Sequence, residues 1–180
     1  MCELQQQIGV GVGEQGLTIL SAMTSLSLYE DLLSPGEKLD LPAGGRIVYV
    51  ASGELAGLHA GRAAFGADES TISAGSDGAT VLRWELTEWS ADDAKLSAHI
   101  DLDPWADYAM RCELDGGPAT GPGIGCVLRG ELAVDGDLVQ PFGAFVEPAE
   151  VSGRGSFVRV VLVRAEDSNG DALAQGSLHL

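Results

Sequence analysis

Positive charge is scarce in this sequence. Ten lysine and arginine residues stand against 27 aspartate and glutamate residues, and the formal net charge is −17. A chain with this charge repels the phosphates of nucleic acid and the head groups of anionic lipid. We therefore predict that neither nucleic acid nor a membrane is a partner of this protein.

Cysteine and long hydrophobic runs are also scarce. The three cysteines form no CxxC pair, a pattern that is typical of a reducing compartment. No apolar run approaches the roughly 20 residues that a membrane-spanning helix needs. The N-terminus has no basic region of the kind that opens a signal peptide. These features predict a cytoplasmic protein.

Long amphipathic helical patterns are missing as well, and only residues 88–95 suggest a helical turn or two. Short segments rich in valine and isoleucine, closed by glycine, predict strands throughout. Asp135-Gly136 predicts a two-residue hairpin turn, because glycine tolerates positive φ. The stretch GLHAG, residues 57–61, is its expected counterpart. The clearest predicted strands are residues 46–51, 80–86, 124–128 and 158–163.

One phrase of the sequence occurs twice, at an offset of 77 residues. GGRIVYVASGELAG, residues 44–57, matches GPGIGCVLRGELAV, residues 121–134, and the triplet FGA recurs at the same offset in residues 65–67 and 142–144. Two copies with so long a period favour duplication of a small domain over a solenoid. The predicted organisation is an N-terminal coil or edge strand in 1–17, a first unit in 18–92, a second unit in 97–166, and a C-terminal hairpin or tail in 167–180.

Residues 100–165 resemble the cupin superfamily. The resemblance lies in IDLDPWADYAMRCELDGG, in GPGIGCVLRGELAVDG, and in the later FGAFVEPAEV and FVRVVLVRA. Residues 33–87 resemble it more weakly, through the repeat. The resemblance implies an all-β fold with little helix, in which two cupin-type β-barrels of the jelly-roll kind form a bicupin. It also implies a divalent metal held by three histidines and a glutamate, ligands that suit iron, manganese, nickel or zinc.

The sequence does not keep those metal ligands. The family spacing places them at Gly117, Ala119, Gly123 and near Gly153 in the second copy, and at Pro42, Gly44, Arg46 and near Gly78 in the first. The three histidines, at 59, 99 and 179, are not spaced as a ligand set. We therefore predict no cofactor and no metal, with a site built from His99 and acidic residues as the open alternative.

Arg46 is the first of four candidate ligand-binding residues. It replaces the metal glutamate of the first copy, so the resemblance implies that its side chain points into the barrel. An inward guanidinium needs an anionic or hydrogen-bonding partner. It either recognises the carboxylate of a small molecule or forms an internal ion pair with an acidic residue of its own copy, namely Asp68, Glu69 or Asp77.

The other candidates are Glu147, Asp77 and Trp84. Glu147 could serve as a general acid or base if buried, or pair with Arg129 or Arg154. Asp77 lies beside the late metal position of the first copy. Trp84 either lines a pocket or belongs to the core, as aromatic residues in strands often do. No catalytic residue is assigned.

The predicted function is that of a cupin-like protein which has lost the usual metal ligands. It binds a small molecule, for which a carboxylate is one candidate, or serves as a structural module. The alternative is a cupin-type isomerase, lyase or dioxygenase with an atypical metal site, since a fold does not fix a function. Outward apolar residues on the repeated strands need cover, either between the copies or across a homodimer, which we also predict; they are Ile47, Tyr49, Ile124, Cys126 and Leu128.

Overall fold

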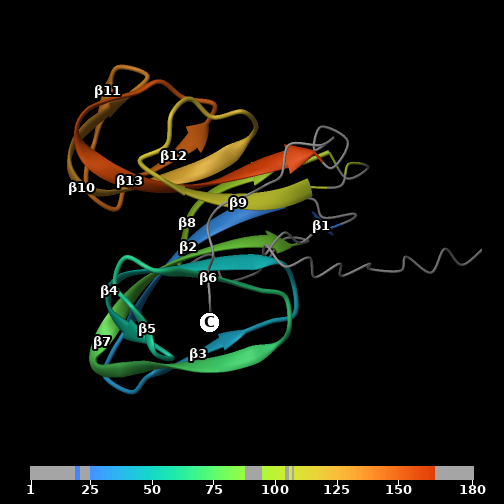
Figure 1. Cartoon of the computed structure of the whole chain (residues 1–180), viewed down its shortest axis with the longest axis vertical. Helices are drawn as coiled ribbons and strands as arrows, with labels where there is room; N and C mark the ends of the chain where they lie inside the picture. The colour runs from blue at the N-terminus through green and yellow to red at the C-terminus, as the bar shows by residue number, and fades with distance from the viewer. Residues whose placement is uncertain (1–18, 21–24, 88–94, 104–105, 107, 165–180) are drawn as a thin grey trace, which may run out of the picture.

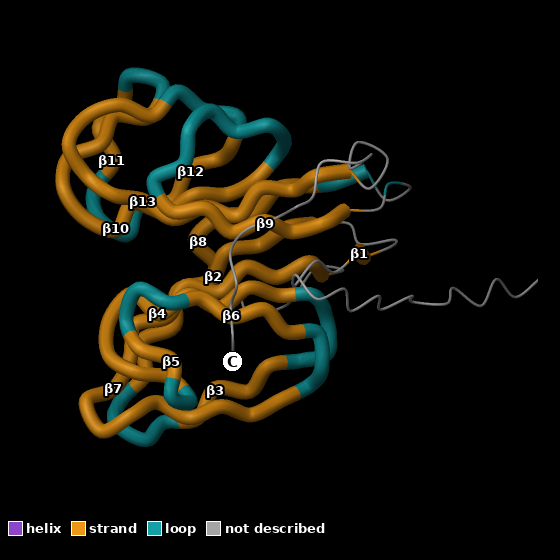
Figure 2. Tube along the Cα trace, viewed as in Figure 1, coloured by secondary structure: helices purple, strands orange, loops and turns teal. Residues whose placement is uncertain are grey.

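The computed structural model describes residues 19–20, 25–87, 95–103, 106 and 108–164. The regular structure in this part of the chain is β-strand, arranged in two antiparallel sheets that each curve around their own interior (Figures 1 and 2). The all-β fold predicted from the sequence is confirmed. Within these described ranges no helix is long and apolar enough to cross a membrane. The predictions for 1–17, 88–94 and 167–180 lie outside the described residues.

The first unit is a seven-stranded sheet with the order β5-β4-β7-β2-β8. Strand β3 pairs with β7, and β6 pairs with β4. Its strands are β2 (Ser25–Leu33), β3 (Lys38–Leu41), β4 (Arg46–Leu55), β5 (Leu58–His59), β6 (Ala63–Gly66), β7 (Ser70–Thr87) and β8 (Leu96–Asp101).

The second unit is a six-stranded sheet with the order β1-β9-β13-β10-β11, in which β12 pairs with β10. Its strands are β1 (Ile19–Leu20), β9 (Tyr108–Leu114), β10 (Gly123–Val134), β11 (Asp137–Val139), β12 (Ala144–Glu147) and β13 (Val151–Arg164). The order β9-β13-β10-β11 repeats the order β2-β7-β4-β5 of the first unit. The two units thus share a strand order, while their origin by duplication stays a prediction.

Each sheet contains one strand that the sequence analysis assigned to the other unit. Strand β8 lies at the start of the predicted second unit, but it pairs with β2 of the first sheet. Strand β1 lies at the start of the predicted first unit, but it pairs with β9 of the second sheet. The predicted divisions at 18–92 and 97–166 therefore do not coincide with the edges of the sheets.

The apolar residues of the repeated strands divide between two faces because side chains alternate along a strand. In β4, Val48 and Val50 belong to the core inside the first unit, and Ile47 and Tyr49 belong to a core shared by both sheets. The shared core also contains Ile124 and Cys126 of β10, with Leu128 packed against it. The outward apolar residues are therefore covered between the two units of one chain. A third cluster, around Phe145 and Phe157, fills the second unit.

The two hairpins that follow the repeated phrase differ in length. Asp135 and Gly136 form the predicted turn, with φ of 51° and 89° between the paired residues Val134 and Asp137. The corresponding turn of the first unit is Ala56-Gly57, so the expectation that GLHAG forms this turn is wrong.

The longer second hairpin changes the register of the strand that follows it. Phe65 lies in β6 opposite Ile47, whereas the residue opposite Ile124 is Val146 of β12. Phe142 lies before β12 with a φ of 65°. The two FGA triplets are therefore not structurally equivalent, although they match in sequence.

Candidate functional site

A buried arginine stands at the centre of the second unit. Arg159 of β13 is 2% exposed, and its Nε and Nη2 atoms donate to Glu113 Oε2 of β9 at 2.8 and 2.6 Å. Its Nη1 donates to Glu147 Oε1 of β12 at 2.6 Å, and Nη2 also donates to the carbonyl of Gly117. Three strands and one loop thus converge on a single guanidinium.

The two glutamates keep this guanidinium charged. Burial acts to lower the pKa of Arg159, but hydrogen bonds and charge from Glu113 and Glu147 outweigh it and leave the pKa raised. Arg111 adds a second cation, because its Nη2 lies 2.6 Å from Glu113 Oε1. The cluster therefore contains two positive and two negative side chains, and its formal charges balance.

A pocket of about 430 Å³ lies over this cluster, between the chain that joins β9 to β10 and the chain that joins β12 to β13. Arg159 lines it together with Phe157, whose ring lies 5.6 Å from the guanidinium carbon and packs edge-on against Phe145. The remaining lining residues are Gly116, Gly117, Pro118, Ala119, Asp135, Pro148, Ala149, Glu150 and Val151. The pocket thus combines apolar walls, a charged floor and an acidic rim, and its volume is typical of small-molecule sites.

The first unit contains a related buried cluster. Arg83 of β7 lies opposite Val48, and Arg159 lies opposite Gly125. Val48 and Gly125 match each other in the repeat, so the two arginines lie at matching positions. Arg83 Nε donates to Asp31 Oδ2 at 2.9 Å, and Arg83 Nη1 donates to Glu85. Lys95 Nζ lies 3.1 Å from Asp31 Oδ1. Burial acts to lower the pKa of Arg83, but Asp31 and Glu85 together leave it raised.

Arg46 points into the first unit, as the resemblance implied, and is 3% exposed. Its partners are mainly backbone oxygens. Nη1 donates to the carbonyls of Pro42 and Gly44, and Nη2 donates to the carbonyl of Asp68 and to Ser70 Oγ at 3.1 Å. Burial lowers the pKa of Arg46, and the charge of Glu85 offsets part of this effect. Arg46 thus ties together two loops of its own unit.

Glu147 is buried and faces Arg159, which the sequence analysis did not name as its partner. Its Oε2 also accepts a hydrogen bond from the Ala149 amide at 2.7 Å. Arg129, one of the two predicted partners, instead donates to Ser156 Oγ at 3.1 Å. Glu147 therefore helps to build the floor of the second-unit pocket.

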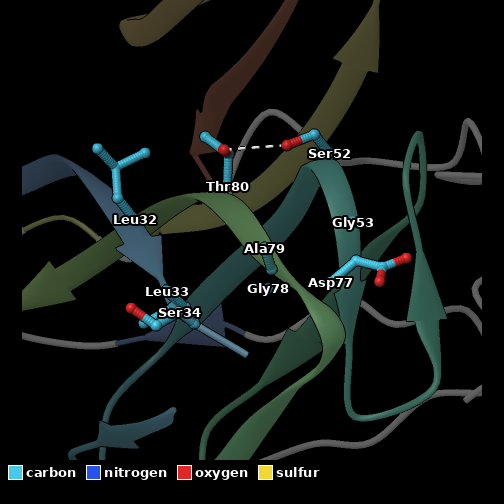
Figure 3. Close-up of a pocket in the computed structure, with 9 residues that line it drawn as sticks. All are labelled: Leu32, Leu33, Ser34, Ser52, Gly53, Asp77, Gly78, Ala79 and Thr80. Atoms are coloured by element: carbon cyan, nitrogen blue, oxygen red, sulfur yellow. Dashed lines mark hydrogen bonds between the residues drawn. The ribbon is translucent and has the colours of Figure 1, made fainter. Parts of the chain in front are cut away.

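Asp77 lines a different pocket, an open hollow of about 490 Å³ on the first unit. A hydroxyl pair, Ser52 and Thr80, lies in the same hollow with 2.9 Å between the two oxygens. Figure 3 shows the Asp77 carboxylate pointing away from this pair. The structure thus separates Asp77 from Glu147, because Asp77 lines a hollow of the first unit and Glu147 is bound to Arg159 in the second.

Trp84 lines neither of the two pockets described above. It is fully buried in the core between the sheets, where its Nε1 donates to the Ile124 carbonyl at 2.9 Å. Of the two interpretations offered by the sequence, the structure places this residue in the core. It connects the two units.

The residues at the implied metal positions do not fit a metal centre. A side chain at Gly123 would approach Val161 Cα to 3.0 Å, and one at Gly153 would approach Leu132 Cα to 3.3 Å. Gly117, another of these positions, supplies a carbonyl to Arg159 instead. Across the described ranges, no group of three or more His, Cys, Asp or Glu side chains lies together as a metal site requires.

Sequence reasoning missed Arg159 and Glu113, the two residues that hold the floor of the pocket. The available signal was the alternation in FVRVVLVR, residues 157–164, where one arginine interrupts a run of apolar residues. In a strand that is buried on both faces, such a residue points into an interior and needs a buried partner.

Comparison with solved structures gives matches at low identity and with TM-scores below 0.5. No family model matches the chain, and no curated protein matches it. The crystal structure of AerE from Microcystis aeruginosa is 15% identical, with a TM-score of 0.48, and the match covers 82% of this chain and 91% of that one. A cupin 2 conserved barrel domain protein from Leptotrichia buccalis is 17% identical, with a TM-score of 0.38 and coverages of 86% and 92%. Protein Ylba from E. coli is 8% identical, with a TM-score of 0.44 and coverages of 86% and 93%.

Proposed function

We propose that this chain is a cupin-type small-molecule binding protein, and that its site is the pocket over Arg159 in the second unit. The observation that carries the proposal is the pocket itself. It is a concave space of about 430 Å³ that joins apolar walls to a buried, fully charged arginine. Binding here needs no metal, because the cation at the base of the pocket is a side chain of the protein.

A screen of small metabolites by ligand-observed NMR tests this proposal, with Gly117→Phe as the blocking variant. A Cβ at Gly117 meets no atom within 4 Å, so the new ring can enter the pocket without a backbone clash. The matched control is Ser34→Phe, which places the same ring in the hollow of the first unit. We expect Gly117→Phe to abolish binding and Ser34→Phe to leave it unchanged. Binding that survives Gly117→Phe contradicts the assignment of the site.

The alternative is a cupin-type enzyme, an isomerase, lyase or dioxygenase, with an atypical metal site. Elemental analysis of protein purified without chelator separates the two. Our proposal expects far less than one equivalent of iron, manganese, nickel or zinc per chain, and a stoichiometric metal overturns it. The third possibility is that the protein serves as a structural module. A metabolite screen that finds no ligand favours this possibility.

The predicted homodimer needs separate support. The apolar residues that suggested it are covered by the core between the two units of one chain. We retain the dimer as a proposal, to be tested by light scattering at micromolar concentration, where a monomer mass contradicts it.

A further inference from the structure

The charges around the second-unit pocket restrict the ligands it can accept. Resting on the binding function proposed above, we infer that the pocket selects uncharged molecules that present a hydrogen-bond acceptor, such as a carboxamide, and discriminates against carboxylates. This differs from the carboxylate ligand that the sequence suggested for Arg46.

The floor of the pocket has no positive charge left for an anion. Glu113 and Glu147 both contact Arg159 at 2.6 Å, and Arg111 is paired with the second oxygen of Glu113. A carboxylate ligand in the pocket would compete with the carboxylates of Glu113 and Glu147, which are already paired with Arg159. A buried anion without a cation of its own is strongly disfavoured.

Acidic residues at the rim of the pocket also repel an anionic ligand. The charged residues that line the pocket, besides Arg159, are Asp135 and Glu150. Both are acidic and exposed, and Asp135 Oδ1 accepts a hydrogen bond from the Glu150 amide at 2.8 Å, which holds the two residues together. An anionic ligand would pass between two like charges, which lowers its affinity and its association rate.

One hydrogen of the Arg159 guanidinium has no acceptor among the hydrogen bonds of the described residues. A guanidinium has five N–H groups. Within the described part of the chain, Nε donates once, Nη2 donates twice and Nη1 donates once. The second hydrogen of Nη1 has no acceptor there, while Arg159 lines the pocket and is almost wholly buried. A carbonyl or hydroxyl oxygen of a ligand satisfies this hydrogen without adding charge.

The walls suit the remaining part of such a ligand. Phe157, Pro118, Pro148 and Val151 present apolar surface on the sides of the pocket. A flat amide with an apolar body can therefore place its oxygen on Arg159 and its ring against the walls, as in small-molecule sites that combine apolar surface with few polar groups.

The test compares ligands that differ only in charge. The probes are benzamide against benzoate, and nicotinamide against nicotinate, titrated by saturation-transfer NMR at pH 7.5. We expect each amide to bind at least about tenfold more tightly than its carboxylate, since the juxtaposition of like charges disfavours binding. In the variant D135N/E150Q, which keeps the shapes of both rim residues, we expect the carboxylates to gain affinity about threefold or more relative to their amides.

Three results overturn the inference, and one of them also removes the function. If both carboxylates bind as tightly as their amides, the pocket does bind small molecules but does not select against charge. If the carboxylates gain nothing in D135N/E150Q, the acidic rim does not discriminate. If Gly117→Phe leaves amide binding unchanged, the probes bind elsewhere and the pocket is not the site, so the proposed function fails with the inference.

Discussion

Arg159 is the buried cation that pairs with both Glu113 and Glu147 in the second unit. Replacing it with methionine leaves the buried Glu147 without a cation and leaves Glu113 paired with Arg111 alone. Removing one partner of a buried ion pair typically costs about 3–5 kcal/mol, and we expect a loss of this size in the free energy of unfolding, measured in urea. Arg129→Met is the matched control, because Arg129 is exposed and donates one described hydrogen bond, to Ser156. A loss in Arg159→Met no larger than that in the control contradicts this role.

Burial also controls the chemistry of two cysteines. It raises the pKa of Cys112 and of Cys126 to about 12, with a smaller contribution from the charges of Glu113 and Glu30 respectively. The thiolate is the reactive form, and at pH 8 each thiol has about a thousandfold less of it than a thiol of pKa 9, so each should react more slowly. We expect the native Cys2→Ser variant to resist a thiol-specific dye and to release two equivalents of reactive thiol in denaturant. Rapid native labelling contradicts the raised pKa of these two thiols.

At the level of strands, the packing of β10 against β12 depends on a glycine. A Cβ at Gly125 would lie 2.6 Å from Phe145 Cε1 and within the volume of the ring. Inserting a methyl group into a packed core typically costs about 1–3 kcal/mol, so Gly125→Ala should lower the urea midpoint by a corresponding amount. Gly117→Ala is the control, because its new methyl group meets nothing within 4 Å. Equal stability of the two variants contradicts the tight fit of Phe145.

Strands were predictable where the pattern is local. Ile47 and Tyr49 were correctly expected to face outward and to need cover, and Asp135-Gly136 correctly predicted a turn. The difference between the two FGA triplets was not predictable from such local patterns. Two extra residues on each side of the second hairpin shift the register of β12, and a sequence match with a constant offset cannot detect this shift.

The candidate site was less predictable than the strands, because its members come from separate elements. Glu147 was identified from its sequence context, but its partner Arg159 lies on β13 and the second carboxylate, Glu113, lies on β9. Pairings between distant strands depend on the closure of the sheet, which no short motif encodes. Arg46 was correctly expected to point inward, and its carbonyl partners depend on how two loops close around it.

The whole chain should unfold as one cooperative body, although it contains two sheets. The shared core takes Leu26, Leu28 and Trp84 from the first sheet, and Met110, Ile124 and Val160 from the second. Strand β1 precedes residue 95 but pairs in the second sheet, and strand β8 follows residue 95 but pairs in the first sheet. A fragment that ends at residue 95 therefore loses β8 and exposes one wall of this core, and a fragment that begins at residue 96 loses β1.

We expect neither fragment, 1–95 or 96–180, to show a cooperative thermal transition by circular dichroism, and both to bind a hydrophobic dye, because each exposes the apolar face that the other covers. The intact chain should show one transition, with calorimetric and van't Hoff enthalpies that agree. Mixing the fragments should restore the transition, since the exchanged strands and Trp84 can then regain their partners. A sharp transition in either fragment alone contradicts the shared core as the basis of stability, and two separate transitions in the intact chain would show that the units fold independently.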